Sequence, residues 1–495
     1  MKQVFLSVFM LLFLLACTDK EEFLDAVSNP PPGDETPIDP PKDDGTPTPP
    51  QDDQSQDNEL KAFPSAQGAG AYAKGGRGGR VIPVTTLDDG DYEGTFRWAL
   101  KQPYPRTVVF RVSGEIVLNS ELLISGQSRS FLTIAGQTAP RGGVTIRGNR
   151  LFFFDVNDIV IRYIRIRQSS SNNQDVMTLM GCSNIMIDHV STSFGGDEAM
   201  SATDGGTKFV NNITIQRSLI GESKTGSIMG ALSSGSEQNA GNFSFHHNLF
   251  VDISHRFPNI SGNGNFEIIN NVVHNWQNRL TRINYAPRLN LINNYYQRGL
   301  VTVNQDINRI MHKIAYSEQH TPQIYTSGNL IVPDVLTDPN RDNWFMWTIF
   351  LDTNRFSANE PAPESFKRDE PFTLLGSPIK IQSAENAFQD VLENVGCNMV
   401  VSENGEKNSF IDELDDYYIN MVKYRASSLY RSVSLWSYPS LPSNAPYADS
   451  DLDGMPDAWE RANGLDPKNP EDRNGDANNN GYTNLEEFLN RVDFN

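Results

Sequence analysis

Three six-residue segments that each end in Asn recur at intervals of 23 residues near the middle of the chain. They are residues 243–248 (FSFHHN), 266–271 (FEIINN) and 289–294 (LNLINN). Apolar residues recur at alternate positions, which is the pattern of a short strand with one buried face. A repeat of this length is typical of one coil of a parallel β-solenoid, in which equal positions of successive coils lie above one another. The sequence therefore predicts an all-β solenoid whose stacked Asn side chains form a hydrogen-bonded ladder.

The repeat extends in both directions at looser spacing. Residues 159–164, 185–190 and 213–218 show a related pattern upstream, and residues 323–329 show it downstream. Evenly spaced strands also occur in β-sandwiches, which are the alternative. Sandwich strands are joined by hairpin turns, and the Asn-Asn pairs fit the corners of coils better.

The N-terminus has the features of an export signal. An apolar run from Val4 to Ala16 ends at Cys17 and is too short to span a bilayer comfortably. It resembles a bacterial lipoprotein signal with Cys17 as the lipidated residue; an ordinary secretory signal or an uncleaved anchor is the alternative. Residues 18–61, rich in Pro and Asp, predict a disordered tether. We therefore expect an exported monomer that is lipid-anchored at the outer membrane or cell surface.

The net charge of −20 is concentrated at the two ends of the chain. Residues 18–58 hold twelve acidic and two basic residues, and residues 447–495 hold twelve and four, which gives −10 and −8. With Lys2 taken into account, residues 59–446 are left near −3. This central part therefore does not as a whole repel an acidic polymer. No nucleic acid partner is expected.

The last 49 residues, 447–495, contain two segments with the spacing of a twelve-residue calcium loop. Both place oxygen-bearing residues at positions 1, 3, 5, 9 and 12 and a Gly at position 6. We expect a small calcium-loop module whose ions stabilise its own fold. The predicted ligands are Asp449, Asp451, Asp453, Asp457 and Glu460 in the first loop, and Asp476, Asn478, Asn480, Asn484 and Glu487 in the second.

Several motifs resemble those of the pectate lyases of polysaccharide lyase family 1, and the likeness covers roughly residues 62–300. The motifs are residues 62–72 (AFPSAQGAGAY), 75–79 (GGRGG), 95–100 (TFRWAL), 134–140 (IAGQTAP), 161–167 (IRYIRIR) and 187–189 (IDH). The resemblance implies a right-handed parallel β-helix over residues 62–446. It also implies cleavage of polygalacturonate by β-elimination with Ca²⁺ and an arginine base.

By position in these motifs, the resemblance implies that Asp175 and Asp197 bind the catalytic calcium, with Glu198 as a neighbouring possibility. Because coils of a solenoid lie about 4.8 Å apart, carboxylates one coil apart can meet around one ion. Ser201 stands where many relatives have a further carboxylate. Asp197 and Glu198 are adjacent, so we expect them to face opposite sides of a strand.

Arg256, in the segment His-Arg-Phe-Pro, matches the catalytic arginine of the family. A second family arginine five residues later is Ser261 here. Lys224, Arg279 and Arg282 are the predicted substrate-binding residues, because cationic side chains bind uronate carboxylates.

The predicted function is thus that of a calcium-dependent polysaccharide lyase that releases unsaturated oligogalacturonides from an acidic plant polysaccharide. The alternatives are a lyase for a related uronan such as rhamnogalacturonan, a β-helix glycoside hydrolase, and a non-catalytic polysaccharide binder. A glycoside hydrolase needs two carboxyl groups that flank one bond, which the expected opposite facing of Asp197 and Glu198 disfavours.

Overall fold

The computed structural model describes residues 59–168, 173–206, 208–232, 234–307, 309–316, 319–334, 342–351, 355–426 and 437–493. Within it, Leu60–Asn495 forms one compact unit, distinct from Met1–Glu59. The predicted lipidation site Cys17 and the tether up to residue 58 lie outside the described residues. In the described part, no helix is both long and apolar enough to cross a membrane.

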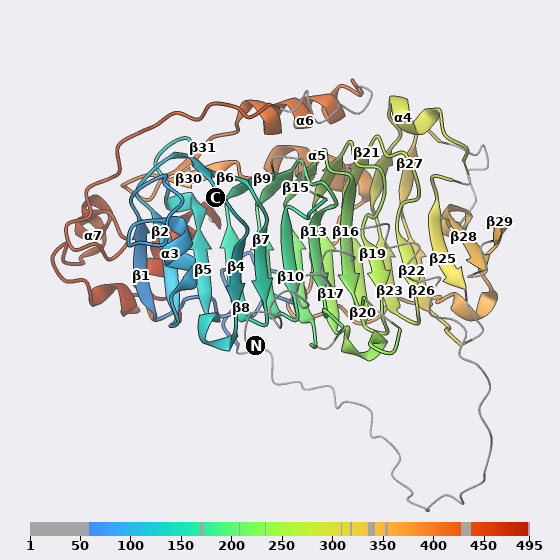
Figure 1. Ribbon diagram of the computed structural model, residues 1–495, viewed down its shortest axis with the longest axis horizontal. Coiled ribbons are helices and arrows are strands. Elements are labelled where there is room, and N and C mark those ends of the chain that lie inside the picture. The colour runs from blue at the N-terminus through green and yellow to red at the C-terminus, as the bar shows by residue number, and fades with distance from the viewer. Residues whose placement is uncertain are drawn as a thin grey trace, which may run out of the picture. The chain divides into compact units, whose positions relative to one another are not determined.

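Three long sheets wind around one axis, as Figure 1 shows. Sheet one consists of β1 (Arg80–Val84), β2 (Arg106–Phe110), β5 (Leu132–Ala135), β8 (Asn157–Arg162), β11 (Ser183–Asp188), β14 (Asn211–Gln216), β17 (Asn242–His246), β20 (Asn265–Ile269), β23 (Arg288–Ile292) and β26 (Gln323–Ser327). Sheet two consists of β4 (Leu122–Ser125), β7 (Leu151–Phe154), β10 (Met177–Met180), β13 (Glu198–Thr203), β16 (Thr225–Gly230), β19 (Asn259–Ser261), β22 (Arg282–Asn284), β25 (His312–Tyr316), β28 (Trp347–Leu351) and β29 (Arg355–Glu360). Sheet three consists of β3 (Gly114–Val117), β6 (Val144–Gly148), β9 (Arg165–Gln168), β12 (Ser191–Ser193), β15 (Leu219–Gly221), β18 (Leu249–Val251), β21 (Val272–His274), β24 (Tyr295–Gln297) and β27 (Leu330–Val332).

Each coil contributes one strand to each sheet, and neighbouring strands pair in parallel, except that β29 pairs antiparallel with β28. In sheet one, Phe243 pairs with Phe266 and Phe266 pairs with Leu289, so the register of β17, β20 and β23 follows the 23-residue repeat. The downstream segment also belongs to the stack, because Leu289 pairs with Ile324 in β26. The predicted parallel β-solenoid is confirmed.

The corner between sheets one and three is the most regular turn of the coil. In the seven coils from β8 and β9 to β26 and β27, two residues separate the strands there, and the first of them has φ between 47° and 67°. These residues are Tyr163, His189, Arg217, His247, Asn270, Asn293 and Gly328. The left-handed conformation turns the chain sharply, and Asn and Gly adopt it more readily than most residues.

The second corner residue forms the predicted Asn ladder. Asn271 Oδ1 accepts hydrogen bonds from the backbone N of Asn248 at 3.1 Å and from its Nδ2 at 3.0 Å. Asn294 Oδ1 accepts the same pair from Asn271, and Asn329 Oδ1 accepts it from Asn294. All four side chains are buried, so the ladder satisfies corner amides that water does not reach.

The interior of the coils is apolar and stacked. Ile215, Phe245, Ile268 and Leu291 occupy one register position on successive strands, and each is at most 3% exposed. Burying such a side chain stabilises the fold by roughly 1.5–3 kcal/mol. The stack therefore supplies much of the free energy that keeps the strands in register.

Helices and a hairpin cover parts of the outer surface. The helices are α3 (Phe96–Lys101), α4 (Leu300–Val303), α5 (Ala384–Asn394), α6 (Glu413–Lys423), α7 (Asp457–Asn463) and α8 (Asn484–Leu489), and the hairpin consists of β30 (Met399–Val401) and β31 (Lys407–Ser409). Leu249 and Val272 on sheet three pack with Val391 of α5 and Tyr418 of α6. Arg167 on the same sheet donates to Asp412 at 2.6 Å and Asp415 at 2.9 Å. This layer thus covers part of sheet three.

Candidate active site

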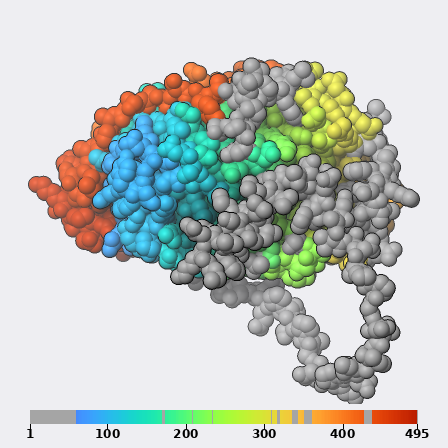
Figure 2. All heavy atoms as spheres, viewed as in Figure 1, coloured from blue at the N-terminus to red at the C-terminus, as the bar shows by residue number. Residues whose placement is uncertain are grey.

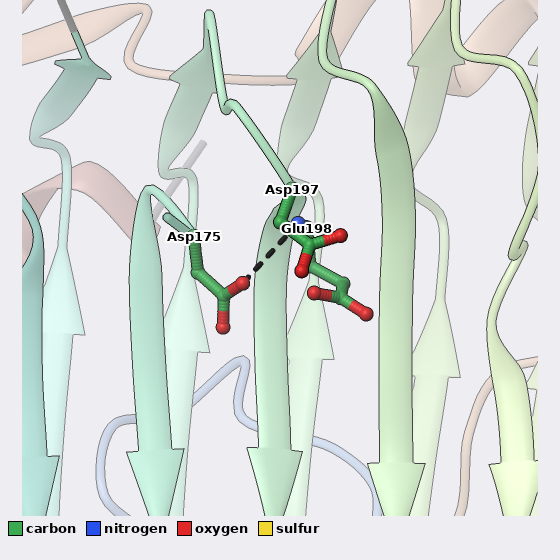
Figure 3. Close-up of side chains that lie close together, drawn as sticks. All are labelled: Asp175, Asp197 and Glu198. Atoms are coloured by element: carbon green, nitrogen blue, oxygen red, sulfur yellow. Dashed lines mark hydrogen bonds between the residues drawn. The ribbon is translucent and has the colours of Figure 1, made fainter. Parts of the chain in front are cut away.

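Three carboxylates meet where two neighbouring strands of sheet two begin. Asp175 precedes β10, Asp197 lies in the bend before β13, and Glu198 is the first residue of β13. Met177 pairs with Met200, so the starts of the two strands lie side by side. One oxygen of each carboxylate lies within 4.8 Å of the others, as Figure 3 shows. The structure therefore brings together the residues predicted to bind the catalytic calcium.

The expectation that Asp197 and Glu198 face opposite sides is wrong. Alternation of side chains holds only within a strand, and Asp197 lies in the preceding bend. Figure 3 draws both carboxylates on the same side of the strand. One oxygen of each lies within 4.8 Å of an oxygen of Asp175. The predicted opposite facing of Asp197 and Glu198 therefore no longer argues against a glycoside hydrolase.

Hydrogen bonds orient Asp175 within this group. Its Oδ2 accepts from Thr178 Oγ1 at 2.8 Å and from Ser201 Oγ at 2.5 Å, and its Oδ1 accepts from the backbone N of Glu198 at 3.2 Å. Ser201 thus places a neutral donor on Asp175. Asp175 is 6% exposed, so these donors fix its orientation away from bulk water.

Arg256 reaches the carboxylates from a loop two coils further on. Residues 252–258 connect β18 to β19, and Arg256 has a φ of 74°. The backbone N of Gly226 donates to the carbonyl of His255, and the N of Ser227 donates to the carbonyl of Arg256, both at 2.8 Å. A Cβ on Gly226 would overlap the Arg256 carbonyl, so this close approach requires glycine.

The guanidinium of Arg256 contacts two of the three acids. Its Nη1 forms an ion pair with Glu198 Oε1 and lies 3.8 Å from Asp197 Oδ1. The Arg256 side chain is 9% exposed, whereas Glu198 is fully buried and Asp197 is 21% exposed. Asp197 is therefore the acid of this group that is open to a ligand from solvent.

Cationic side chains surround the loop on the other side of Arg256. Burial lowers the pKa of the His255 imidazole, and the positive charges of Arg279, Arg256, Lys224 and Arg282 act in the same direction. Together they bring this pKa to about 2. The predicted substrate-binding residues Lys224, Arg279 and Arg282 thus lie close enough to act on one group. Lys224 is exposed, and the two arginines are half-buried. The field here is positive, which suits an anionic ligand.

Lys313 extends this positive region and was not predicted from the sequence. It pairs with Arg282 across β22 and β25, and its Nζ donates to Thr348 Oγ1 at 2.6 Å. Burial lowers its pKa to about 8, and the charge of Arg279 acts in the same direction. The connection from β22 to β25 is longer than 23 residues, so counting repeats along the chain does not place Lys313 on this sheet.

The histidines and cysteines of the neighbouring coils lie outside the site. His246 and His247 are buried, and their Nδ1 atoms lie 3.0 Å apart at the coil corner. Cys182 and Cys397 are both buried free thiols. Among the described residues, the groups of side chains close enough to hold a metal contain none of these four.

The two predicted calcium loops fold differently from each other. In the first, Asp449, Asp451 and Asp453 lie together, as do Asp453, Glu460 and Asp472. Asp457 instead accepts hydrogen bonds from Ser450 and from Arg461.

In the second loop, Asp476 accepts from the backbone N of Asn480 and of Gly481, and Glu487 accepts from Asn480 Nδ2. Asn478 also accepts from the N of Asn480, at 3.1 Å. Asn484 accepts from the N of Ala477 and donates to the carbonyl of Asp472. The side chains of this loop therefore turn inward onto its own backbone.

The fold and the site together define a class: a parallel β-helix protein with an acidic group, a buried arginine and a group of cations beside one sheet. A family model described as pectate lyase matches residues 125–307. Proteins described as probable pectate lyase C from Aspergillus oryzae and Emericella nidulans are 30% and 31% identical to this chain. Both alignments cover 88% of this chain, and they cover 94% and 93% of the fungal proteins. This chain belongs to the pectate lyase family.

Among solved structures, the major allergen from cedar pollen, jun a 1, has a TM-score of 0.50 and 16% identity to this chain. The match covers 68% of this chain and 93% of the allergen. At this identity the likeness concerns the fold alone, and it agrees with the coil architecture described above.

Proposed function

We propose that this protein is a pectate lyase that cleaves polygalacturonate by calcium-assisted β-elimination, with Arg256 as the general base. The family relationship supports the reaction class. The observation that supports Arg256 as the base is its ion pair with Glu198 of the acidic group, in a loop whose His255 is influenced by the charges of the predicted substrate-binding residues. A polymer of uronates lying along sheet two would meet both groups of residues.

The chemistry requires removal of the proton on C-5, which is α to the uronate carboxylate. In the proposed reaction Arg256 takes this proton, a double bond forms between C-4 and C-5, and the bond from C-4 to the glycosidic oxygen breaks. The bonding electrons leave with that oxygen, which then takes a proton from water. An arginine accepts a proton only in its neutral form, so this role requires Arg256 to be deprotonated when the substrate is bound.

Asp175, Asp197 and Glu198 have the donor set that suits calcium. Calcium prefers six to eight oxygen ligands, and three carboxylates that meet within 4.8 Å fit this preference with room for substrate oxygens. When bound there, Ca²⁺ supplies positive charge that acidifies the C-5 proton of a coordinated uronate. Ser201 and Thr178 hold Asp175 in the orientation this requires.

In the proposed complex, the cations at sheet two bind the other carboxylates of the polygalacturonate. Lys224, Arg279 and Arg282 surround His255, and Lys313 is paired with Arg282 one strand further on. Strands of a sheet lie about 4.8 Å apart, which is comparable with the length of one sugar unit. We therefore infer that successive uronates contact successive coils.

The test is an assay of Arg256→Lys on polygalacturonate, which follows the ultraviolet absorbance of the unsaturated product with and without a chelator. We expect turnover to fall by about 1,000-fold, or about 4 kcal/mol of transition-state stabilisation, because an ammonium cannot reproduce the placement of a guanidinium. Arg282→Lys is the matched control, since it keeps a charge that only binds substrate, and it should change KM more than kcat. An Arg256→Lys enzyme that keeps a tenth of the wild-type turnover excludes the assignment of the base.

Parallel digests of other polyuronates, followed by sizing of the products, test the substrate. We expect polygalacturonate to be cleaved faster than a rhamnogalacturonan. A preference in the other direction would assign a related uronan as the substrate.

We further propose that the enzyme is an exported lipoprotein anchored through Cys17. The support is the apolar segment that ends in Leu-Leu-Ala-Cys. Replacement of Cys17 by Ser should release the protein from the membrane fraction. Equal membrane association of both forms would contradict the lipid anchor.

The spacing of the loops at residues 449–460 and 476–487 supports a further proposal, that each binds a structural calcium ion. Their ions would act on the fold and not on the reaction.

A further inference from the structure

Five carboxylates converge beside the first calcium loop, and one of them lies outside the loop. Oxygens of Asp449, Asp451 and Asp453 lie within 4.8 Å of one another, and so do oxygens of Asp453, Glu460 and Asp472. Asp453 belongs to both groups and joins them. Asp472 follows α7 by nine residues and lies in a single helical turn (Asp472–Asn474).

Most oxygens of this group are buried without a hydrogen-bond donor. Among the described residues, the oxygens of these five acids that have no hydrogen-bond partner are Asp449 Oδ1, both Oδ atoms of Asp451, Asp453 Oδ2, both Oε atoms of Glu460 and Asp472 Oδ1. Glu460 is fully buried and Asp453 is 1% exposed. Buried carboxylates without donors are costly, and such groups normally pair with a cation or coordinate a metal.

The residue at position 9 of the loop does not join the group. Asp457 Oδ1 accepts from the backbone N of Ser450 at 2.7 Å, and its Oδ2 accepts from Ser450 Oγ at 2.9 Å and Arg461 Nη2 at 2.8 Å. Asp472 takes its place among the ligands. The backbone N of Asp466 donates to Asp472 Oδ2 at 2.9 Å, which leaves Oδ1 directed at the group.

The same loop lies against the first coils of the β-helix. Arg111, directly after β2, donates to Asp449 Oδ2 at 2.9 Å. A Cβ on Gly454 would lie 3.1 Å from a methyl group of Val81 in β1 and 3.4 Å from one of Val109 in β2. In Figures 1 and 2 the segment that contains α7 lies at the β1 end of the coils.

Further apolar and charged contacts join the C-terminal segment to the β-helix. Met455, Trp459 and Phe488 share one buried cluster with Ala135 and Tyr163 of the β-helix. Near the end of the chain, Asp493 pairs with the buried Arg162 of β8 at 2.6 Å. The C-terminal segment, residues 447–493, which carries all five acids, is therefore attached to the coils that begin the solenoid.

We propose that Asp449, Asp451, Asp453, Glu460 and Asp472 form a single calcium site, and that its ion fixes the C-terminal segment onto β1 and β2. Five carboxylates and no nitrogen or sulfur ligand suit a hard cation of large coordination number, which favours Ca²⁺ over Mg²⁺. This deepens the proposed calcium binding by the first loop: it adds Asp472, removes Asp457, and makes the stability of the β-helix depend on the ion.

The ligand set is tested by calorimetric titration of the full chain with CaCl₂ after chelation. We expect Asp472→Asn to weaken the affinity of one site by about tenfold or more, as Glu460→Gln should also do. Asp457→Asn is the matched control, because it keeps the side-chain size and removes a charge outside the group, and it should change that affinity by less than about threefold. Equal effects of the substitutions at positions 457 and 472 would overturn the proposed ligand set. A Glu460→Gln chain in which every calcium affinity equals that of the wild type would show that the loop binds no calcium at all.

The coupling is tested by hydrogen exchange of the backbone amides of β1 and β2. Removal of calcium from the wild-type protein should speed exchange in β1 and β2 by at least about tenfold, while β20 and β23 keep their protection. The Asp472→Asn protein should show fast exchange in β1 and β2 at calcium concentrations that protect the wild type. Unchanged exchange in these strands, in a protein that still titrates with calcium, would overturn the coupling and leave the calcium site itself in place.

Discussion

Replacement of Asn271 by Ala should be among the most destabilising single changes in the solenoid. Asn271 Oδ1 accepts from both the backbone N and the Nδ2 of Asn248, and its own Nδ2 donates to the carbonyl of Phe245 at 2.8 Å. Alanine removes these three hydrogen bonds and also the bond from Nδ2 to Asn294 Oδ1. Asn271 is 2% exposed, so water cannot replace them without entering the corner.

The expected loss in the free energy of unfolding follows from the buried groups that Asn271→Ala leaves without partners. The N of Asn248 and the carbonyl of Phe245 lose their side-chain partners, and each unsatisfied buried group costs about 1–3 kcal/mol. With a small cavity added, we expect the free energy of unfolding to fall by about 3–6 kcal/mol. Urea unfolding followed by circular dichroism measures the loss as a shift of the midpoint at constant m-value.

Asn265→Ala is the matched control for this experiment. Asn265 also extends a row of stacked Asn residues, but its Nδ2 makes one bond, to Asn242 Oδ1 at 2.8 Å, in a partly exposed position. We expect a loss of about 1 kcal/mol or less. Losses of equal size for the two variants would refute the reasoning that the buried ladder is what stabilises the corner.

Four further substitutions probe the site and its surroundings. Asp175→Ala and Asp197→Ala should raise the calcium concentration needed for half-maximal activity by about tenfold or more, and unchanged dependence in both would exclude the acidic group as the metal site. Burial raises the pKa of Glu267 from 4.5 to about 7, so the folded protein binds more protons than the unfolded chain and loses stability as the pH rises through that window. Glu267→Gln should therefore flatten the decline in urea midpoint between pH 4.5 and 7, whereas a decline as steep as in the wild type would contradict it. Because the pKa of Lys313 lies near 8, its charge is lost above that pH. KM for polygalacturonate should therefore rise with pH across this value in the wild type. An equal rise in Lys313→Gln would show that Lys313 does not bind the substrate.

The coil architecture could be predicted because it depends on local pattern. Each coil repeats the same alternation and the same corner, so Phe243, Phe266 and Leu289 reveal their register from spacing alone. The ladder through Asn248 and Asn271 follows from the same count. Such features require no knowledge of contacts between distant parts of the chain.

The geometry of the site depended on contacts that spacing does not determine. The ion pair between Arg256 and Glu198 joins residues 58 positions apart through two stacked strands and a loop of irregular length. The bend that brings Asp197 to the same side as Glu198 breaks the alternation from which the opposite placement was predicted. Asp472 was not predicted as a ligand because it lies outside the twelve-residue motif that contains the other four acids of the proposed calcium site.

The outer layer of sheet three was also not foreseen. Helices α5 and α6 have no counterpart in the repeat, and they are held by buried pairs such as Arg167 with Asp412. A sequence period describes the strands that generate it. It does not describe a later segment that folds back over them.

The corner between sheets one and three has a consequence for where this molecule can be enlarged. From β8 and β9 onward, two residues separate the strand ends there. The first is in the left-handed conformation, and in the coils with Asn248, Asn271, Asn294 and Asn329 the second is on the ladder. An inserted residue would move the ladder side chain out of line with its neighbours above and below. The connections that enter and leave sheet two vary in length from coil to coil, and the loop with Arg256 is one of them. New loops intended to change which polymer is bound should therefore be grafted beside sheet two, where added length leaves the spine of the solenoid intact.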